Sequence, residues 1–132
     1  MNSPLATAQQ YQQVEVATAD RGRLLLLVFD GALRFLAQAE QALHVSDERR
    51  FAMQLGRAQA VIAELMHTLD HERGGAIARD LERLYRFMLD HLVEANLQKS
   101  PGSVARVARL LDIIASAYRE ILRAHAGQLD AA

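Results

Sequence analysis

The sequence predicts an all-α protein, an antiparallel up-down four-helix bundle with a flexible N-terminal arm. Hydrophobic residues make up 51% of the 132 residues and aromatic residues only 5%, so we expect one domain with an aliphatic core. Two prolines and seven glycines leave long stretches without helix breakers. Apolar residues recur in steps of three and four, which is the helical period. We expect an arm over residues 1–17, the bundle over residues 18–127 and a tail over residues 128–132.

The first helix is expected to begin at Thr18 or Asp20, which are both favourable N-caps, and to end near His44. It contains six consecutive large apolar residues, Leu-Leu-Leu-Leu-Val-Phe, at positions 24–29. Because successive helical residues lie about 100° apart, this run surrounds the helix, whereas a bundle needs an apolar stripe only a little over about 100° wide. The residues expected to face the bundle are Leu26, Phe29, Leu33, Leu36 and Leu43.

The other side of this helix carries the first candidate binding residues. Its apolar side chains are expected to be shielded from water by something other than the bundle core. Contiguous apolar surface marks interaction sites, so the cover is expected to be the arm, a second subunit or a partner chain. An equally simple interpretation is a helix packed against several neighbours. Gly31 is included because its bare backbone lets a partner approach closely. The candidates on this side are Leu24, Leu27, Val28, Gly31 and Phe35, and those in the arm are Tyr11 and Val16.

A second helix is expected over residues 47–71, ended by Gly74–Gly75. Its apolar residues are spaced 4, 3, 4, 3, 4, which is a regular seam. They are Phe51, Leu55, Ala58, Ile62, Leu65 and Leu69. The next helix is expected to bury Ile77, Leu81, Leu84, Met88, Leu92 and Ala95.

The fourth helix is expected to begin with Ser100 as the N-cap and Pro101 at its first position, or with Ser103 as the cap. It should end near Gly127. Short connections make successive helices antiparallel. The residues expected to face the core are Val104, Val107, Leu111, Ile114, Tyr118 and Ile121.

Catalytic, metal and nucleic-acid sites are poorly supported by the sequence. The formal net charge is −1 and cysteine is absent, so we expect no nucleic-acid partner, no cysteine chemistry and no cofactor. Glu64 and His67 have the Glu-x-x-His spacing of di-metal bundles, but both are expected to face solvent, so no metal site is predicted. The apolar run is also shorter than the roughly 20 residues that span a bilayer, which argues against membrane insertion.

Four sequence segments together resemble the flagellar secretion chaperones, the export chaperones specific for flagellin. The N-terminal segment has their pattern of Tyr-Gln, Val-x-Thr-Ala and Asp-Gly-Ala-Leu. Residues 57–70 and 84–96 resemble the second and third helices of that family, and Tyr118 stands where an aromatic residue is usual. This sequence departs from the pattern at Val14, Arg21 and Phe29. The matching N-terminal residues are Tyr11, Gln12, Val16, Thr18, Ala19, Leu24, Asp30, Gly31, Ala32 and Leu33.

The resemblance implies a cytoplasmic chaperone, not an enzyme, that binds the C-terminal region of flagellin. It would block premature polymerisation and assist delivery to the export apparatus, with an export-gate component as a further candidate partner. The arm would cover part of the apolar surface until flagellin binds. Leu89, Val93 and Asn96 lie off the third-helix seam and are expected to extend the binding groove or to form a second core layer.

Two other interpretations stay open at this stage, as does the choice between a monomer and a homodimer. One is a plain homodimeric helical bundle, in which the wide apolar face pairs with its copy. The other is a histidine phosphotransfer bundle built around His67. In that class a Lys and a Gly follow the histidine motif, and here Asp70 and His71 occupy those positions, where the carboxylate would repel a phosphoryl group.

Overall fold

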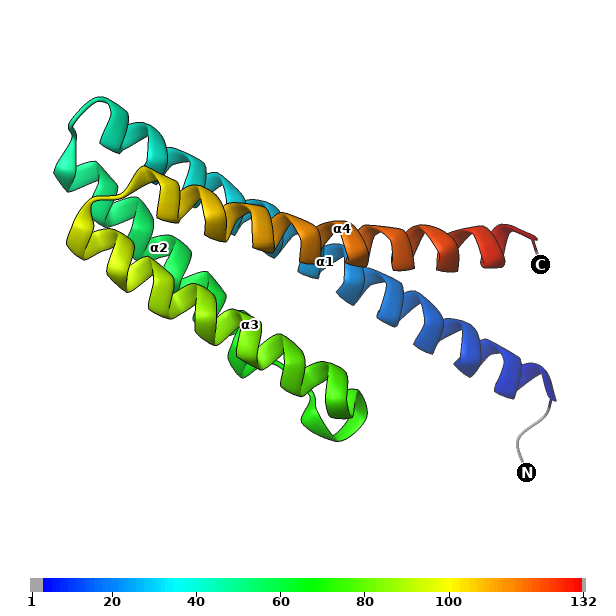
Figure 1. The fold of residues 1–132 in the computed structure, drawn as a ribbon. Helices are drawn as coiled ribbons and strands as arrows, with labels where there is room; N and C mark the ends of the chain where they lie inside the picture. Colours follow the sequence, from blue (N-terminus) through cyan, green and yellow to red (C-terminus); the bar gives the residue numbers. More distant parts are fainter. Residues whose placement is uncertain (1–3, 132) are drawn as a thin grey trace.

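The protein consists of four long helices joined by links of two or three residues, α1 (Pro4–His44), α2 (Glu48–His67), α3 (His71–Gln98) and α4 (Pro101–Ala131) (Figure 1). The structure is a computed structural model that describes the backbone of residues 4–131 and the side chains of residues 21–127. The predicted all-α, four-helix fold is confirmed. The predicted start of the first helix at Thr18 or Asp20 was wrong, because the helical backbone of α1 begins at Pro4. The side chains of the predicted arm, including Tyr11 and Val16, lie outside the described residues, so its role stays a prediction.

The helices form a closed ring in which α1 packs against α2 and α4, and α3 packs against the same two helices. Consequently α1 and α3 occupy opposite corners of the bundle. Sequence neighbours are spatial neighbours, as short links require, and the contact of α1 with α4 closes the ring (Figure 1). A Cβ atom on Gly22 would collide with the end of the Leu122 side chain, so the glycine permits close approach of α1 and α4.

A side-chain cap starts each of the last three helices. The Arg50 N–H donates to the Asp47 carboxylate at 3.1 Å, and the Arg73 N–H donates to Asp70 at 3.1 Å. Ser100 Oγ accepts from the Ser103 N–H at 3.3 Å. Each cap satisfies an N–H group that has no partner within its helix. Of the two starts predicted for α4, the one with Ser100 as the cap is therefore confirmed.

The predicted end of the second helix was wrong, because Gly74–Gly75 lies within α3. The chain leaves α2 at His67, and the Asp70 carboxylate restarts it three residues later. Gly75 has φ 51° and ψ −120°, a backbone conformation that suits glycine because it has no Cβ. Gly75 therefore interrupts the helical backbone after the first turn of α3 and kinks the helix at that point.

The core is mainly aliphatic, as predicted, although its three largest fully buried side chains are aromatic, Tyr85, Phe29 and Phe51. Its best-predicted part is α2. The five seam residues within that helix are all buried, as are Phe29 and Leu36 of α1. Leu26, Leu33 and Leu43 are partly buried and pack against the same core. The buried seam residues of α2 are Phe51, Leu55, Ala58, Ile62 and Leu65.

The seam of α3 differs from the prediction in its first half. Ile77 and Leu84 are exposed, whereas Ala78 and Tyr85 are buried. Steps of three and four backward from Met88 reach either Leu84 or Tyr85, and these neighbours lie about 100° apart on the helix. The structure buries the tyrosine, and this burial raises the pKa of its hydroxyl group. On α4, Ile121 was also predicted to be core and is exposed.

Candidate binding surface on α1

The outward side of α1 exposes two leucines that no other part of the described chain covers. Leu24 is 63% exposed and Leu27 is 65% exposed. Phe29, in the same apolar run, is fully buried and its ring lies 5.5 Å from that of Tyr118 on α4. The run from position 24 to position 29 therefore has side chains both in the core and on the surface, as expected for six apolar residues that surround a helix.

Gly31 follows the two leucines on the same side of α1, and the space around it is open. A Cβ atom built there would have no neighbouring atom within 4 Å, leaving aside adjacent residues and the helix's own backbone. The glycine is thus not required for the internal packing of the bundle. A helical glycine costs up to about 1 kcal/mol of stability relative to alanine, so its presence here is compatible with close approach by another chain.

Val28 and Phe35 lie on the flank of α1 that faces α2. Both are partly buried and pack against the hydrophobic core. The guanidinium carbon of Arg57 on α2 lies 6.0 Å from the centre of the Phe35 ring, a weak cation–π contact. These two side chains therefore form the edge of the exposed surface, with Leu24 and Leu27 at its centre.

A shallow hollow lies on the other flank of α1, towards α4. Its lining residues combine apolar surface with two charges. They are Leu27, Asp30, Leu33, Arg34 and Ala37. We call this hollow, together with Leu24 and Gly31, the α1 face.

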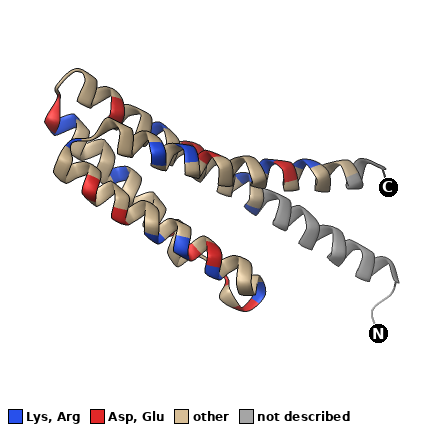
Figure 2. Cartoon of the chain, in the orientation of Figure 1, with Lys and Arg blue, Asp and Glu red and all other residues tan. Residues whose placement is uncertain are grey.

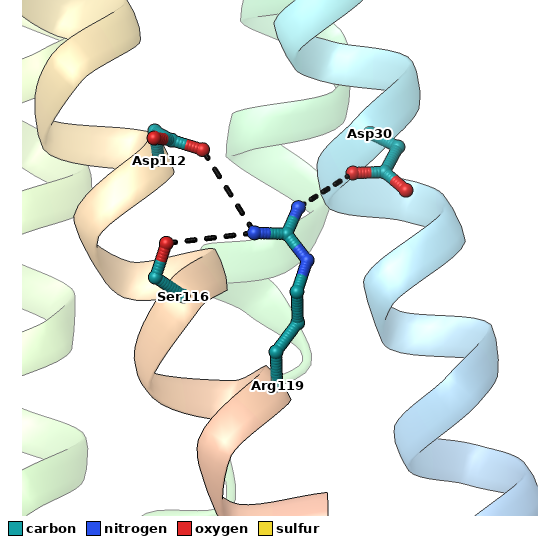
Figure 3. A network of polar contacts seen from close by, with 4 residues as sticks. All are labelled: Asp30, Asp112, Ser116 and Arg119. Carbon is teal, nitrogen blue, oxygen red and sulfur yellow. Dashed lines mark hydrogen bonds and ion pairs between the residues drawn. The ribbon is translucent and has the colours of Figure 1, made fainter. Parts of the chain in front are cut away.

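Arg119 of α4 links the two helices beside the α1 face (Figure 3). Its Nη2 atom donates to Asp30 Oδ1 at 3.0 Å, and its Nη1 atom donates to Ser116 Oγ at 3.4 Å. Asp112 Oδ1 lies 4.0 Å from the same Nη1 atom. One guanidinium group thus lies between both nearby carboxylates and bonds directly to that of Asp30. Such half-exposed pairs contribute little stability, about 0–1 kcal/mol each, but this one fixes where the carboxylate of Asp30 points.

The predicted α3 residues lie away from the α1 face. Val93 and Asn96 are exposed, and Leu89 is partly buried against the core. The Lys99 ammonium group donates to Asn96 Oδ1 at 3.2 Å and lies 5.2 Å from the Phe51 ring of α2, so this end of α3 borders α2. Since α1 and α3 occupy opposite corners, a partner that touches both sets must cross one of the helices between them, α2 or α4.

Sequence reasoning missed a group of exposed apolar side chains on α3 and α4. It assigned Ile77 and Ile121 to the core and did not consider Phe87 or Ile113. Ile77 lines a second hollow, where the link between α2 and α3 meets Tyr118 of α4. The sequence did contain a signal for them, because α3 and α4 have more apolar residues than one buried stripe per helix can hold. The residues of this group are Ile77, Leu84, Phe87, Ile113 and Ile121.

The structure gives no support to the metal and phosphotransfer sites considered from the sequence. Glu64 and His67 are both exposed, as predicted. Within residues 21–127, no three side chains of the metal-ligating types gather in one place. The Asp70 carboxylate is engaged as the cap of α3, close to where a phosphoryl group would need positive charge. None of the described helices has the length and apolarity required to cross a membrane.

Comparison with known proteins agrees with the resemblance in the sequence. The family profile of the flagellar protein FliS matches residues 4–125. The flagellar secretion chaperone FliSB of Pseudomonas aeruginosa is 38% identical over 107 residues, which cover 78% of this chain and 85% of that protein. The flagellar secretion chaperone FliS of Salmonella typhimurium is 34% identical over 88% of this chain and 87% of its own length. That of Bacillus subtilis is 32% identical over 86% and 84%.

Proposed function

This chain belongs to the FliS family of flagellar secretion chaperones, and we propose that it binds the C-terminal region of flagellin in the cytoplasm. In this role it keeps newly made flagellin from polymerising and assists its delivery to the export apparatus. The proposal needs a surface that holds an apolar segment of another chain. The observation that supports it is the exposure of Leu24 and Leu27 beside the open Gly31.

The size of the α1 face is consistent with useful affinity. Burying one leucine- or phenylalanine-sized side chain contributes about 1.5–3 kcal/mol, so four or five such contacts contribute roughly 6–15 kcal/mol. Ordering a disordered client costs about 2–5 kcal/mol, and loss of translational freedom costs more. With the largest gain and the smallest of these costs, the remainder is roughly 9 kcal/mol, which corresponds to a Kd somewhat below about 1 µM. A complex of this strength is stable enough to protect the client and weak enough to release it.

Calorimetric titration of this protein with the C-terminal segment of flagellin from the same organism tests the proposal. We expect binding near one-to-one, with a negative heat-capacity change because apolar surface is buried. If the folded protein and the soluble segment give no binding by calorimetry and by gel filtration, the proposal fails. A concentration-dependent dimer of this chain under those conditions would then favour the homodimeric bundle.

Gly31 offers a prediction with an internal control. Gly31→Ala should stabilise the fold by about 0.5–1 kcal/mol, because alanine is the better helix former and the site is open. It should also weaken flagellin binding about tenfold, roughly 1.4 kcal/mol, because the new methyl group holds the client away.

Gly56→Ala is the matched control, since Gly56 lies on α2 and is also helical with open space around its Cβ position. It should give the same gain in stability with no change in affinity. Urea unfolding and calorimetry measure the two quantities. Equal affinity of the two variants would show that the client does not approach the backbone of α1 at Gly31.

A further inference from the structure

Two parallel rows of side chains border the seam between α1 and α4. Residues in each row are spaced by three and four, so each row lies along one side of its helix. The contact between Asp30 and Arg119 joins the rows at their centre (Figure 3). The row on α1 contains Arg23, Leu27, Asp30, Arg34 and Ala37, and the row on α4 contains Arg109, Asp112, Ser116, Arg119 and Arg123.

The charge of this surface is positive once its internal pairs are considered. Both carboxylates of the two rows, Asp30 and Asp112, lie against Arg119, at 3.0 Å and 4.0 Å. Arg123 pairs with Glu120 at 3.3 Å. Arg34 and Arg109 are exposed and form no ion pair with any residue in the described part of the chain. Two guanidinium groups on this surface are therefore available to an incoming anion.

Within residues 21–127, whose side chains the structure describes, the excess of positive charge lies on this pair of helices. The described parts of α1 and α4 carry seven arginines against four carboxylates, whereas residues 45–100 carry eight basic and nine acidic residues (Figure 2). The whole chain has a formal net charge of −1. The positive surface is thus a local arrangement along the described part of the seam between α1 and α4, and Arg34 is its arginine on the α1 face.

The apolar groups on this surface lie on the outward side of α1, and positive groups lie next to them. Leu24 and Leu27 lie on the outward side of α1, and Arg34 lines the hollow next to Leu27. A helix laid along such a shallow hollow places apolar side chains at positions i, i+3, i+4 and i+7 on the leucines. The neighbouring flank of that helix then lies over the arginines. Arginine pairs well with carboxylates because its planar guanidinium group donates two parallel hydrogen bonds.

We propose that the segment bound on the α1 face is an amphipathic helix whose apolar stripe is flanked by carboxylates that pair with Arg34 and Arg109. This inference rests on the proposed function and adds the chemistry of the client. Attraction between exposed charges acts mainly on the rate of association and is screened by salt. The leucines supply most of the affinity, and the arginines select the client and its orientation.

Two synthetic helical peptides and the flagellin segment test this inference. The peptides share one leucine stripe, and the flank of one carries glutamates where the other carries lysines. The wild-type protein should bind the glutamate peptide at least about tenfold more tightly than the lysine peptide. Its affinity for the glutamate peptide should fall about fivefold between roughly 0.05 M and 0.5 M salt.

Charge-reversal variants locate the effect. The double variant Arg34→Glu/Arg109→Glu should lose about tenfold in affinity for the glutamate peptide and gain in affinity for the lysine peptide. Arg49→Glu/Arg79→Glu changes the net charge equally through exposed residues of α2 and α3, and should alter both affinities less than about twofold. Equal effects of the two double variants, or equal binding of the two peptides by the wild-type protein, overturn the inference.

The flagellin segment separates failure of this inference from failure of the proposed function. If flagellin binds and neither salt nor Arg34→Glu/Arg109→Glu changes its affinity, the function stands and the inference is wrong. If the glutamate peptide binds as expected and flagellin does not bind at all, the surface chemistry is correct and flagellin is not its client.

Discussion

Replacing Leu27 by aspartate should reduce the affinity for the flagellin segment about a hundredfold or more while leaving the fold intact. The variant removes a contact worth about 1.5–3 kcal/mol and places a charge where the client buries apolar surface. Because Leu27 is 65% exposed, the free energy of unfolding should change by less than about 0.5 kcal/mol. Calorimetric titration and urea unfolding followed by circular dichroism measure the two effects.

Ile77→Asp is the matched control for this variant. Ile77 is a similarly exposed aliphatic residue, 71% exposed, on α3 at the opposite corner of the bundle. It should bind flagellin with an affinity within about threefold of the wild type, since a distant surface charge has little effect at physiological salt. If Leu27→Asp unfolds the protein, the α1 face belongs to the core. If both variants lose affinity equally, the client does not depend on α1 in particular.

Replacing Phe29 by alanine should, unlike Leu27→Asp, cause a large loss of stability. Its side chain is fully buried and lies against Tyr118, at a distance of 5.5 Å between ring centres. Truncation of a buried phenylalanine leaves a cavity and costs about 3–5 kcal/mol. For a chain of this size such a loss is a large fraction of the total free energy of unfolding, about 5–15 kcal/mol.

Leu24→Ala provides the comparison for Phe29→Ala within the same six-residue run. This exposed residue should change the free energy of unfolding by less than about 0.5 kcal/mol. Urea unfolding of the two variants gives the difference directly. Similar losses for both would mean that another part of the chain covers Leu24, and the predicted arm would be the first segment to remove in a test of that possibility.

The sequence determined most of this fold because helical periodicity is a local property. The seam of α2 and the capping of α4 by Ser100 were predictable from spacing and residue type alone. The α3 seam was less predictable, because Leu84 and Tyr85 both continue the period from Met88. Only packing against the neighbouring helices determines which of the two is buried. The same limit applies to Gly74–Gly75. A glycine pair signals a change of backbone direction but does not say whether the helix ends or bends.

The candidate site was predictable in part for a related reason. The width of the apolar run on α1 indicated that some leucines face outward, and Leu24 and Leu27 are exposed in the structure. The separation of Leu89, Val93 and Asn96 from these leucines depends on the order of helices around the bundle. So does the link from Asp30 to Arg119, which are 89 positions apart. Neither relation is contained in the spacing of residues along one helix.

Closure of the ring by α1 and α4 has a consequence during synthesis. Domains emerge from the ribosome N-terminal end first, so α1 exists before the helix that covers its inner flank. Until α4 arrives, Phe29 has no Tyr118 to pack against and Gly22 has no Leu122. A nascent chain of this protein therefore presents its leucine run to solvent on two sides until α4 packs against α1.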